Sequence, residues 1–308
     1  MKKQKSFSEV AMLWKENKRN QVKRSTLSIY SLMLQKHLLP AFGRRDRITE
    51  ADVQQFVDNK LLTLSPKTVQ DLLTVLKMVY RHGVKLRLLP HEEWRVNIPG
   101  AAWKRDVEVL TVAHQRRLLD FVTRNFSLRN LGLMICLCTG MRIGEVCALK
   151  WQDINPEKRT VVVTKTVERI SVANGTGPRT QLVVGTPKTR NSHREIPLSS
   201  QLFGMIAPLL KVVNPDFFIL TNDSRPTEPR TYRNHFNRLL KQLGIPAIKF
   251  HAMRHSFATR CIESDCDYKT VSALLGHASV STTLNLYVHP TLAQKHRCIQ
   301  RMCRHLAK

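Results

Sequence analysis

The spacing of apolar residues predicts helices throughout the first hundred positions of the chain. Phe7, Val10 and Trp14 recur at intervals of three and four residues, so they share one face of a helix. A second amphipathic segment begins at Ser25 and is predicted to end before Pro40, because a proline disrupts a helix interior. Each of these helices is expected to bury its apolar face.

Two further helices carry start signals in their first residues. Thr49 is followed three positions later by an acidic residue, which is the pattern of a capping box and predicts a helix over 51–62. Ser65-Pro66 supplies a cap and a proline at the first helical position, ahead of a helix that runs to Gly83. Because no strand pattern interrupts these helices, the first 98 residues are expected to form a compact helical domain.

The pattern changes after a Pro-Gly break, so residues 99–105 are interpreted as a linker and 106–308 as a second domain. Thr111 is positioned to cap a helix, and the apolar run 131–138 predicts a buried helix. β-Branched and alternating segments indicate a small antiparallel β-sheet, with a turn inside it at 174–178. These segments are 160–166, 181–185 and 194–198. Helical spacing then resumes and continues to the end, so the predicted fold class is mainly α.

Charge narrows the choice of partner. The 308 residues include 50 Lys and Arg against 23 Asp and Glu, which gives a net charge of +27. The excess is spread along the chain: residues 1–103 hold 19 basic and 9 acidic side chains, and the remainder holds 31 and 14. Solubility needs a much smaller net charge, so both domains are expected to contact one polyanion, and nucleic acid is the leading candidate.

The cysteines and the N-terminus indicate the compartment. The seven cysteines are odd in number and include no CxxC pair, so they define neither a disulfide framework nor a zinc ribbon. The basic first residues are not followed by the continuous apolar stretch of a signal peptide. The longest apolar run is too short to cross a bilayer. We therefore expect a reduced, cytoplasmic protein with no membrane partner.

Three basic segments point to phosphodiester chemistry. They contain Arg142, Lys188, and His251 with Arg254. Nucleophilic attack on a phosphodiester puts extra negative charge on its nonbridging oxygens, and planar guanidinium groups are well shaped to bind that charge. His251 and Arg254 are three positions apart, so on a helix both side chains could reach one phosphate. His277 is a further candidate donor.

A tyrosine near the C-terminus, Tyr287, is the candidate nucleophile. A phenol has an ordinary pKa of about 10, so its attack needs a base or a strongly positive pocket, and His251 is the expected proton acceptor. Lys188, in a predicted hairpin turn between the second and third predicted strands, would protonate the departing sugar oxygen. Glu145, three residues after Arg142, is expected to orient a basic partner.

These segments resemble those of the tyrosine recombinases, also called phage integrases. Five motifs occur in the family's order over about residues 104–288. They are Thr139-Gly140-Met141-Arg142-Ile143-Gly144-Glu145-Val146, Lys188, His251-Ala252-Met253-Arg254-His255-Ser256-Phe257-Ala258-Thr259, Leu274-Leu275-Gly276-His277 and Tyr287. Ala252 and Met253 stand where Asp and Leu are common, and Ser256 where Thr is common, but no reactive group is lost. The helical first domain resembles the family's core-binding domain.

The resemblance implies a two-domain, C-shaped clamp around double-stranded DNA. Tyr287 would form a 3′-phosphotyrosyl bond and release a 5′-hydroxyl, and a homotetramer on two DNA sites would exchange strands through a four-way junction. Because the phosphotyrosyl linkage retains the bond energy, no cofactor is expected, neither ATP nor a metal. The implied function is that of a site-specific recombinase, the integrase of a mobile element, with accessory DNA-bending proteins as possible further partners.

Other interpretations stay open at this point. A type IB topoisomerase shares the phosphotyrosine chemistry but relaxes supercoils on a single duplex, and a DNA-binding regulator could keep the fold without catalysis. A zinc site at His251 and His255 is disfavoured, because Ala252 stands where a metalloprotease helix needs glutamate. Lys165, also on a predicted strand, is an alternative general acid. The basic, partly apolar segment 294–308 could dock on a neighbouring protomer or on its own domain.

Overall fold

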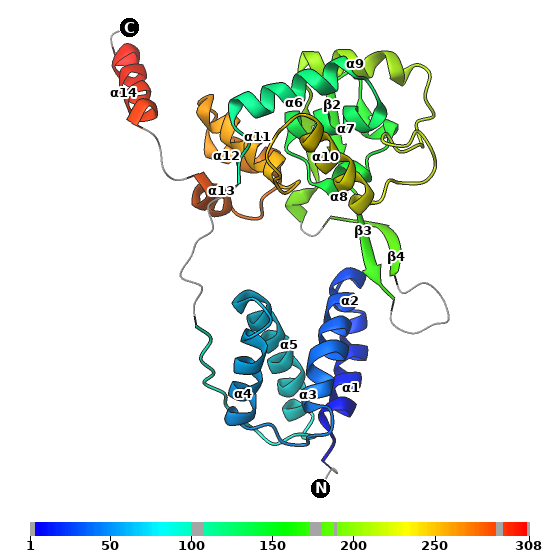
Figure 1. The fold of residues 1–308 in the computed structure, drawn as a ribbon, viewed down its shortest axis with the longest axis vertical. Coiled ribbons are helices and arrows are strands. Elements are labelled where there is room, and N and C mark those ends of the chain that lie inside the picture. The colour runs from blue at the N-terminus through cyan, green and yellow to red at the C-terminus, as the bar shows by residue number, and fades with distance from the viewer. Residues whose placement is uncertain (1–3, 100–107, 173–179, 188–189, 288–291, 307–308) are drawn as a thin grey trace. The chain divides into compact units, whose positions relative to one another are not determined.

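The computed structural model describes residues 4–99, 108–172, 180–187, 190–287 and 292–306 (Figure 1). The chain divides into two compact units, one of residues 1–105 with 169–181 and the other of 106–168 with 182–308. Each unit has its own buried apolar cluster. The described elements are mainly helices with small antiparallel strand pairings, which confirms the predicted fold class.

The first unit is built from helices. Its elements are α1 (Phe7–Arg19), α2 (Arg24–Met33), the π-helical turn η1 (Leu34–Leu38), α3 (Leu39–Phe42), α4 (Glu50–Leu61) and α5 (Pro66–Lys85). The capping box predicted at Thr49 is confirmed, because Thr49 Oγ1 accepts the Asp52 N–H while Asp52 Oδ2 accepts the Thr49 N–H. Ser65 caps α5 in the predicted way, with Pro66 at its first position. Phe7, Val10 and Trp14 are buried, as their spacing indicates.

One predicted helix boundary in this unit is wrong. The segment expected to end before Pro40 continues through that proline as α2, η1 and α3. Pro40 has no backbone N–H to donate, and the turn ahead of it widens so that the Leu39 N–H donates to the Leu34 carbonyl, five residues back. The π-helical turn therefore accommodates the proline instead of ending the helix.

The second unit contains the remaining helices and the strand residues outside 169–181, which belong to the first unit. Its helices are α6 (Val112–Arg124), α7 (Leu128–Thr139), α8 (Ile143–Cys147), the 3₁₀ turns η2 (Trp151–Asp153) and η3 (Arg190–Ser192), α9 (Ser200–Leu210), α10 (Pro229–Gln242), α11 (Ala252–Glu263), α12 (Tyr268–Leu275), α13 (Val280–Tyr287) and α14 (Leu292–Leu306). The buried helix predicted over 131–138 is confirmed as α7. The sequence pattern does not predict α9, since Gly204 and Pro208 interrupt it. No described helix is long and apolar enough to cross a membrane.

The strands form two small sheets instead of the single sheet predicted. Strands β1 (Ile154–Asn155), β2 (Thr160–Val163) and β5 (Arg194–Pro197) form one antiparallel sheet in which Val161 lies opposite Ile196. Strands β3 (Thr166–Ser171) and β4 (Thr180–Gly185) pair with each other. The predicted hairpin turn around Lys188 is therefore wrong, because β4 and β5 belong to different sheets. The predicted turn at 174–178 and Lys188 itself lie outside the described residues.

Candidate active site

A cavity of about 1200 Å³ in the second unit collects most of the predicted site residues. Arg142 and Glu145 reach it from the start of α8, His251 from the start of α11, and His277 from the loop after α12. Arg233 and Asn237 of α10 complete one part of its wall. Four segments of the second unit, α8, α10, the start of α11 and the loop after α12, therefore meet at one cavity.

Arg142 owes its position to a glycine. Helix α7 ends at Gly140, whose φ of +65° lies in the left-handed region, and a Cβ there would lie 2.5 Å from the Phe257 side chain. The turn places Arg142 as the N-cap of α8, with its side chain 37% exposed. Nη1 of Arg142 donates to Glu145 Oε1 at 2.8 Å. Within the described residues, its other guanidinium nitrogens have no protein partner.

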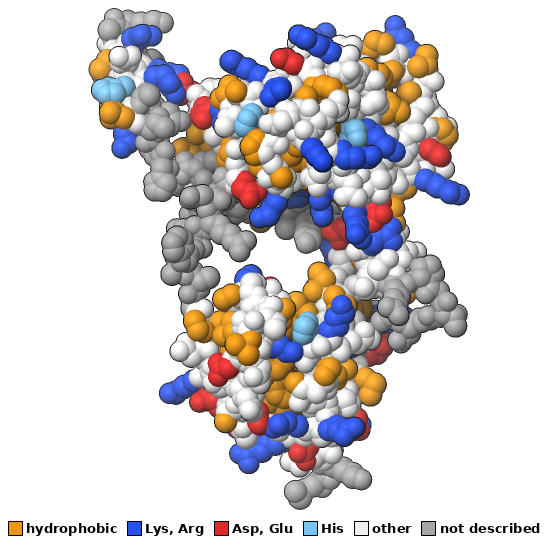
Figure 2. Space-filling model, in the orientation of Figure 1, with side chains coloured by type: hydrophobic (Ala, Val, Ile, Leu, Met, Phe, Trp, Pro, Cys, Tyr) orange, Lys and Arg blue, Asp and Glu red, His pale blue; other side chains and the backbone are white. Residues whose placement is uncertain are grey.

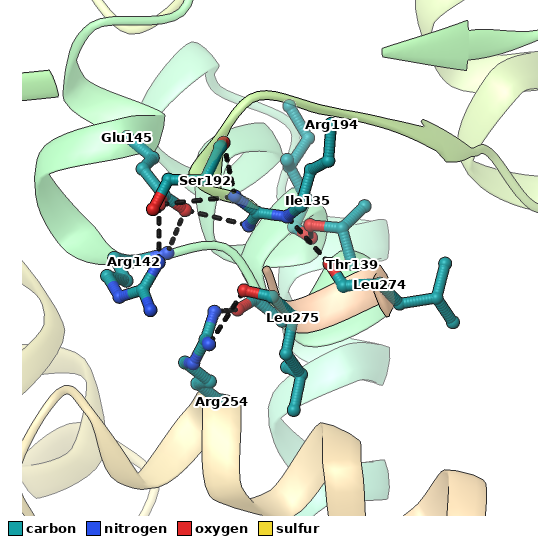
Figure 3. A network of polar contacts seen from close by, with 10 residues as sticks. Ile135, Thr139, Arg142, Glu145, Ser192, Arg194, Arg254, Leu274 and Leu275 are labelled. Atoms are coloured by element: carbon teal, nitrogen blue, oxygen red, sulfur yellow. Dashed lines mark hydrogen bonds and ion pairs between the residues drawn. The ribbon is translucent and has the colours of Figure 1, made fainter. Parts of the chain in front are cut away.

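Glu145 is almost completely buried and is shared by two arginines (Figure 3). Arg194 Nη2 lies 2.8 Å from Glu145 Oε2, and Arg194 Nη1 lies 3.2 Å from Oε1. Burial alone would raise the pKa of Glu145, but the hydrogen bonds and charges of Arg194 and Arg142 outweigh it and lower the pKa below its ordinary value. The carboxylate is therefore ionised at neutral pH and holds both guanidinium groups.

Sequence reasoning missed Arg194, although the strand pattern contains a signal for it. Arg194, Ile196 and Leu198 alternate, and the two aliphatic residues are buried. Residues two apart on a strand share a face, so Arg194 points to the same interior side. A buried guanidinium needs hydrogen-bond acceptors, and the identification of Glu145 as the main one required the fold.

Arg254 lies beneath the cavity and does not line it. Its side chain is 3% exposed, Nη1 donates to the Gly140 carbonyl at 3.0 Å, and Nη2 donates to the Leu275 carbonyl at 2.7 Å. The expectation that Arg254 and His251 face one phosphate side by side is therefore only half met, because His251 lines the cavity and Arg254 supports the backbone under it. The positive charge of Arg254 nevertheless acts on the histidines above.

His251 is suited to accept a proton. It is the N-cap residue of α11, and its ring lies edge-on to His255 with 4.7 Å between centroids. The cavity wall removes much of the water around the ring, and this desolvation, with the charges of His255, Arg254 and Arg142, lowers the pKa of His251 to about 4. His251 is consequently neutral at physiological pH.

His277 is fixed by a turn and by a threonine. Gly276 ends α12 with φ +66°, and Asn191 donates to the His277 carbonyl at 3.2 Å. His277 Nδ1 lies 2.8 Å from Oγ1 of the fully buried Thr283, a contact that sequence reasoning missed. Desolvation and the charges of Arg254 and Arg142 lower the pKa of His277 to about 4. A neutral ring that accepts the Thr283 hydroxyl at Nδ1 has Nε2–H available as a donor.

Two predicted residues have no described side chain. Tyr287 is the last residue of α13, one helical turn after Thr283, and Lys188 lies outside the described residues. The described part of the chain also contains no group of three or more metal-ligating side chains. The described geometry thus unites Arg142, Glu145, His251 and His277 at one cavity, with Arg254 and Arg194 below.

The fold and this cluster of arginines and histidines define a class of DNA strand-exchange enzymes. Residues 108–294 match the phage integrase family, and residues 6–62 match the phage integrase N-terminal SAM-like domain. The chain therefore belongs to the phage integrase family, the tyrosine recombinases, which are site-specific recombination enzymes. The recognition made from the motifs is confirmed, and so is the helical first domain.

Several relatives come from mobile elements. The chain is 28% identical to a tyrosine recombinase XerC-like protein of Caldanaerobacter subterraneus subsp. tengcongensis, over 77% of this chain and 66% of the relative. It is 24% identical to the ICEBs1 integrase of Bacillus subtilis, over 83% and 72%. It is 26% identical to the transposase from transposon Tn916 of Enterococcus faecalis, over 59% of this chain and 48% of that protein. The chain thus spans about half to three quarters of these relatives.

Solved structures share the fold. The Tn1549 transposon integrase in complex with a circular intermediate DNA has a TM-score of 0.74 at 22% identity, over 95% of this chain and 99% of that one. A lambda integrase tetramer bound to a Holliday junction has a TM-score of 0.67 at 16% identity, over 90% and 79%. At these identities the likeness describes the fold of the present chain and not its substrate.

Proposed function

We propose that this chain is the integrase of a mobile element, which cleaves and rejoins double-stranded DNA through a 3′-phosphotyrosyl intermediate on Tyr287. The observation that carries the proposal is the cavity in which Arg142 keeps uncommitted guanidinium nitrogens beside two neutral histidines. A phosphodiester fits this combination, because it needs cationic donors for its nonbridging oxygens and an acceptor for the attacking proton.

The reaction assigns one task to each group. The Tyr287 oxygen attacks phosphorus as its proton passes to His251, and the bond from phosphorus to the 5′ oxygen breaks. Lys188 gives its proton to the departing oxygen. Arg142 and the Nε2–H of His277 bind the developing charge, and Glu145 holds Arg142 in place. Arg254 contributes positive charge from below, through a guanidinium whose position is fixed by two carbonyl groups.

Double-stranded DNA is the proposed partner. Both halves of the chain are strongly basic, and Figure 2 shows Lys and Arg side chains spread over the visible face of each unit. Helix α10 buries Tyr232 and Phe236 and exposes basic residues on the other side, of which Arg233 lines the cavity. The exposed basic residues of α10 are Arg230, Arg233, Arg238 and Lys241. The logarithm of the DNA-binding constant should fall linearly with the logarithm of the salt concentration, with a slope of roughly −0.9 for each phosphate neutralised.

A homotetramer on two DNA sites is the proposed working assembly. The related lambda integrase is a tetramer on a Holliday junction. In the present chain, α14 is basic and exposes apolar residues that could pack on a neighbouring protomer. The exposed apolar residues are Leu292, Ile299, Met302 and Leu306. We place this assembly in the cytoplasm, with DNA-bending proteins as further partners and no membrane.

Covalent trapping tests the proposal. Purified protein is incubated with sheared genomic DNA of the source organism, and adducts that resist denaturant are digested and their DNA ends sequenced. The expected result is a single recurring sequence joined through a 3′ phosphate to Tyr287. An adduct that leads only to relaxed plasmid, without strands joined between two duplexes, would indicate a topoisomerase. The absence of any adduct would indicate a DNA-binding regulator and overturn the proposal.

A further inference from the structure

We propose that Arg194 is a positioning residue for DNA cleavage, which holds Arg142 and His277 in one fixed arrangement by binding Glu145 and the end of α12. The proposal rests on the recombinase function above. Arg194 is 5% exposed at the start of β5, so it is not placed to contact DNA itself. Its effect on the reaction must therefore pass through the groups that it binds.

The Arg194 guanidinium is used on all three nitrogens (Figure 3). Nη2 and Nη1 bind the two oxygens of Glu145, at 2.8 and 3.2 Å. Nε donates to the Leu274 carbonyl at 2.7 Å, and Nη1 also contacts the Ser192 carbonyl at 3.2 Å. A planar guanidinium with fixed donor directions ties β5, the start of α8 and the end of α12 to one another.

The end of α12 is held by two arginines from different elements. Arg194 binds the Leu274 carbonyl and Arg254 binds the Leu275 carbonyl. The last carbonyls of a helix have no partner within the helix and carry its negative dipole end, so two cations stabilise them. Gly276 follows directly, in a left-handed conformation, and a Cβ at Gly276 would lie 3.0 Å from Arg194 Cδ. These contacts set the direction in which the chain enters His277.

Arg194 also controls the charge available to the substrate. Glu145 accepts bonds from both arginines, so only one nitrogen of the Arg142 guanidinium is bound to it, although the Arg142 backbone N–H also donates to Glu145 Oε2 at 2.9 Å. Without Arg194, both oxygens of a buried carboxylate would be left to Arg142, which is its other cation. Arg142 would then bind Glu145 more completely, and a DNA phosphate would have to compete for it. Arg194 therefore keeps Arg142 directed at the cavity.

The test compares Arg194→Met with a matched control, Arg159→Met. Both changes remove one positive charge from the second unit, but Arg159 is exposed and its guanidinium lies 5.5 Å from the Phe203 ring, outside the cavity. The probe is a nicked duplex with the cleavage sequence recovered from wild-type adducts. We expect Arg194→Met to lower the rate of adduct formation by about a hundredfold, because displacements near 1 Å can cost that much. Its affinity for the same DNA should match that of Arg159→Met.

A second substitution separates positioning from folding. Glu145→Gln in the Arg194→Met background removes the carboxylate that would compete for Arg142. The double variant should recover cleavage by about tenfold over Arg194→Met, because a neutral amide competes less than a carboxylate for the Arg142 guanidinium. A purely structural role predicts the opposite, since the double variant loses a second buried contact. Arg194→Lys, which keeps the charge but not the fork, should cleave at an intermediate rate.

The outcomes are distinguishable from failure of the proposed function. If the wild-type chain forms no adduct, the recombinase proposal fails. If the wild type cleaves and Arg194→Met cleaves as fast as Arg159→Met, or Glu145→Gln gives no recovery, the positioning role is overturned. Thermal unfolding shows whether Arg194→Met folds. If it does not, cleavage by the wild type is compared with that by Arg194→Lys and by the double variant of Arg194→Lys with Glu145→Gln. Equal cleavage by Arg194→Lys and the wild type would then reject the role.

Discussion

The residues around the cavity and the C-terminal helices differ in how many contacts fix their side chains. We call five residues the cradle: Arg142, Glu145, Arg194, Arg254 and His277. Hydrogen bonds to several elements hold these side chains, and among them only Arg142 has more than a third of its side-chain surface exposed. Helices α13 and α14 instead expose large apolar side chains, including Leu284, Ile299 and Leu306. The cradle is complete within one chain, whereas the surface of α14 is suited to a partner.

This difference assigns two tasks to two parts of the second unit. Electrostatic binding of a transition state works best when the donors are fixed before the substrate arrives, because no reorganisation is then needed during reaction. The proposed nucleophile, Tyr287, is by contrast on α13, and α14 is the next helix along the chain. We infer that phosphate binding is a property of the protomer and that nucleophile presentation depends on assembly. The predictions below test that division.

The largest expected effect is the loss of the nucleophile. Tyr287→Phe should remove the covalent adduct completely, because no other phenol of the chain belongs to the proposed reaction. Its DNA affinity should stay within about twofold of the wild type, since a single hydroxyl outside the cradle adds little to a contact dominated by phosphates. Adduct formation is measured on denaturing gels and affinity by mobility shift. An adduct formed by the Phe variant would reject Tyr287 and with it the assigned role of α13.

The second-largest effect on the rate of adduct formation is expected from removal of the Arg142 side chain. Arg142→Ala is expected to slow adduct formation by about a hundredfold to a thousandfold, the usual range for one lost oxyanion donor. The variant also frees one side of Glu145, which Arg194 still neutralises. DNA affinity should change little in comparison with the rate. If affinity and rate fell by the same factor, Arg142 would be a binding residue and not a stabiliser of the transition state.

Much of this cradle could be predicted from the sequence, because all its members except Arg194 lie in short motifs of fixed spacing. Arg142, Glu145, His251 and His277 do reach one cavity. The burial of Arg254 under two carbonyls could not be predicted, since those carbonyls belong to Gly140 and Leu275, far away in sequence. Contacts of this kind depend on tertiary packing, and no local pattern encodes them.

The fold shows the same limit. Capped helices such as α4 and α5 follow from side chains within three or four residues of each other, so they are predictable. Strand pairing is not local: β2 pairs with β5 across the whole β3–β4 segment, and three β-rich stretches alone do not reveal that they form two sheets. Arg194 was missed for this reason, because its partner Glu145 is 49 residues away on another element.

A glycine exchange tests how rigid the cradle is. Gly276→Ala should destabilise the fold by about 1–3 kcal/mol, because its φ of +66° is strained for alanine and the added Cβ would lie 2.7 Å from the Asn191 carbonyl oxygen. Gly204→Ala is the matched control: it lies inside α9 with open space around it, and should stabilise by roughly 0.5–1 kcal/mol. Urea unfolding measures both. Equal effects would mean that the turn before His277 is not restrained.

A charge placed on α14 tests whether its exposed apolar residues form an interface with a neighbouring protomer. Ile299→Glu places a charge among the exposed apolar residues and should weaken assembly on DNA by about tenfold, while monomer stability stays unchanged because the side chain is already exposed. Gln300→Glu adds the same charge one position along, to a residue that is also exposed, and should assemble normally. Light scattering of the DNA complexes measures assembly. If both variants assembled alike, the apolar face of α14 would not be an interface.

The last expected effect is on the pH dependence of stability, and it concerns the two histidines of the cavity, His251 and His277. The pKa values of His251 and His277 are lowered to about 4 in the folded chain, against about 6.5 in an unfolded one. Between these values the unfolded state binds protons that the folded state does not, so stability falls as the pH is lowered from about 6.5 toward 4 and is level above 6.5. His251→Gln should reduce that slope, and His251→Gln with His277→Gln should reduce it further. Urea unfolding at intervals from pH 7.5 to 4.5 measures the slopes. A slope identical in all three proteins would show that the rings are solvated in the free chain, and that the cradle is assembled only around DNA.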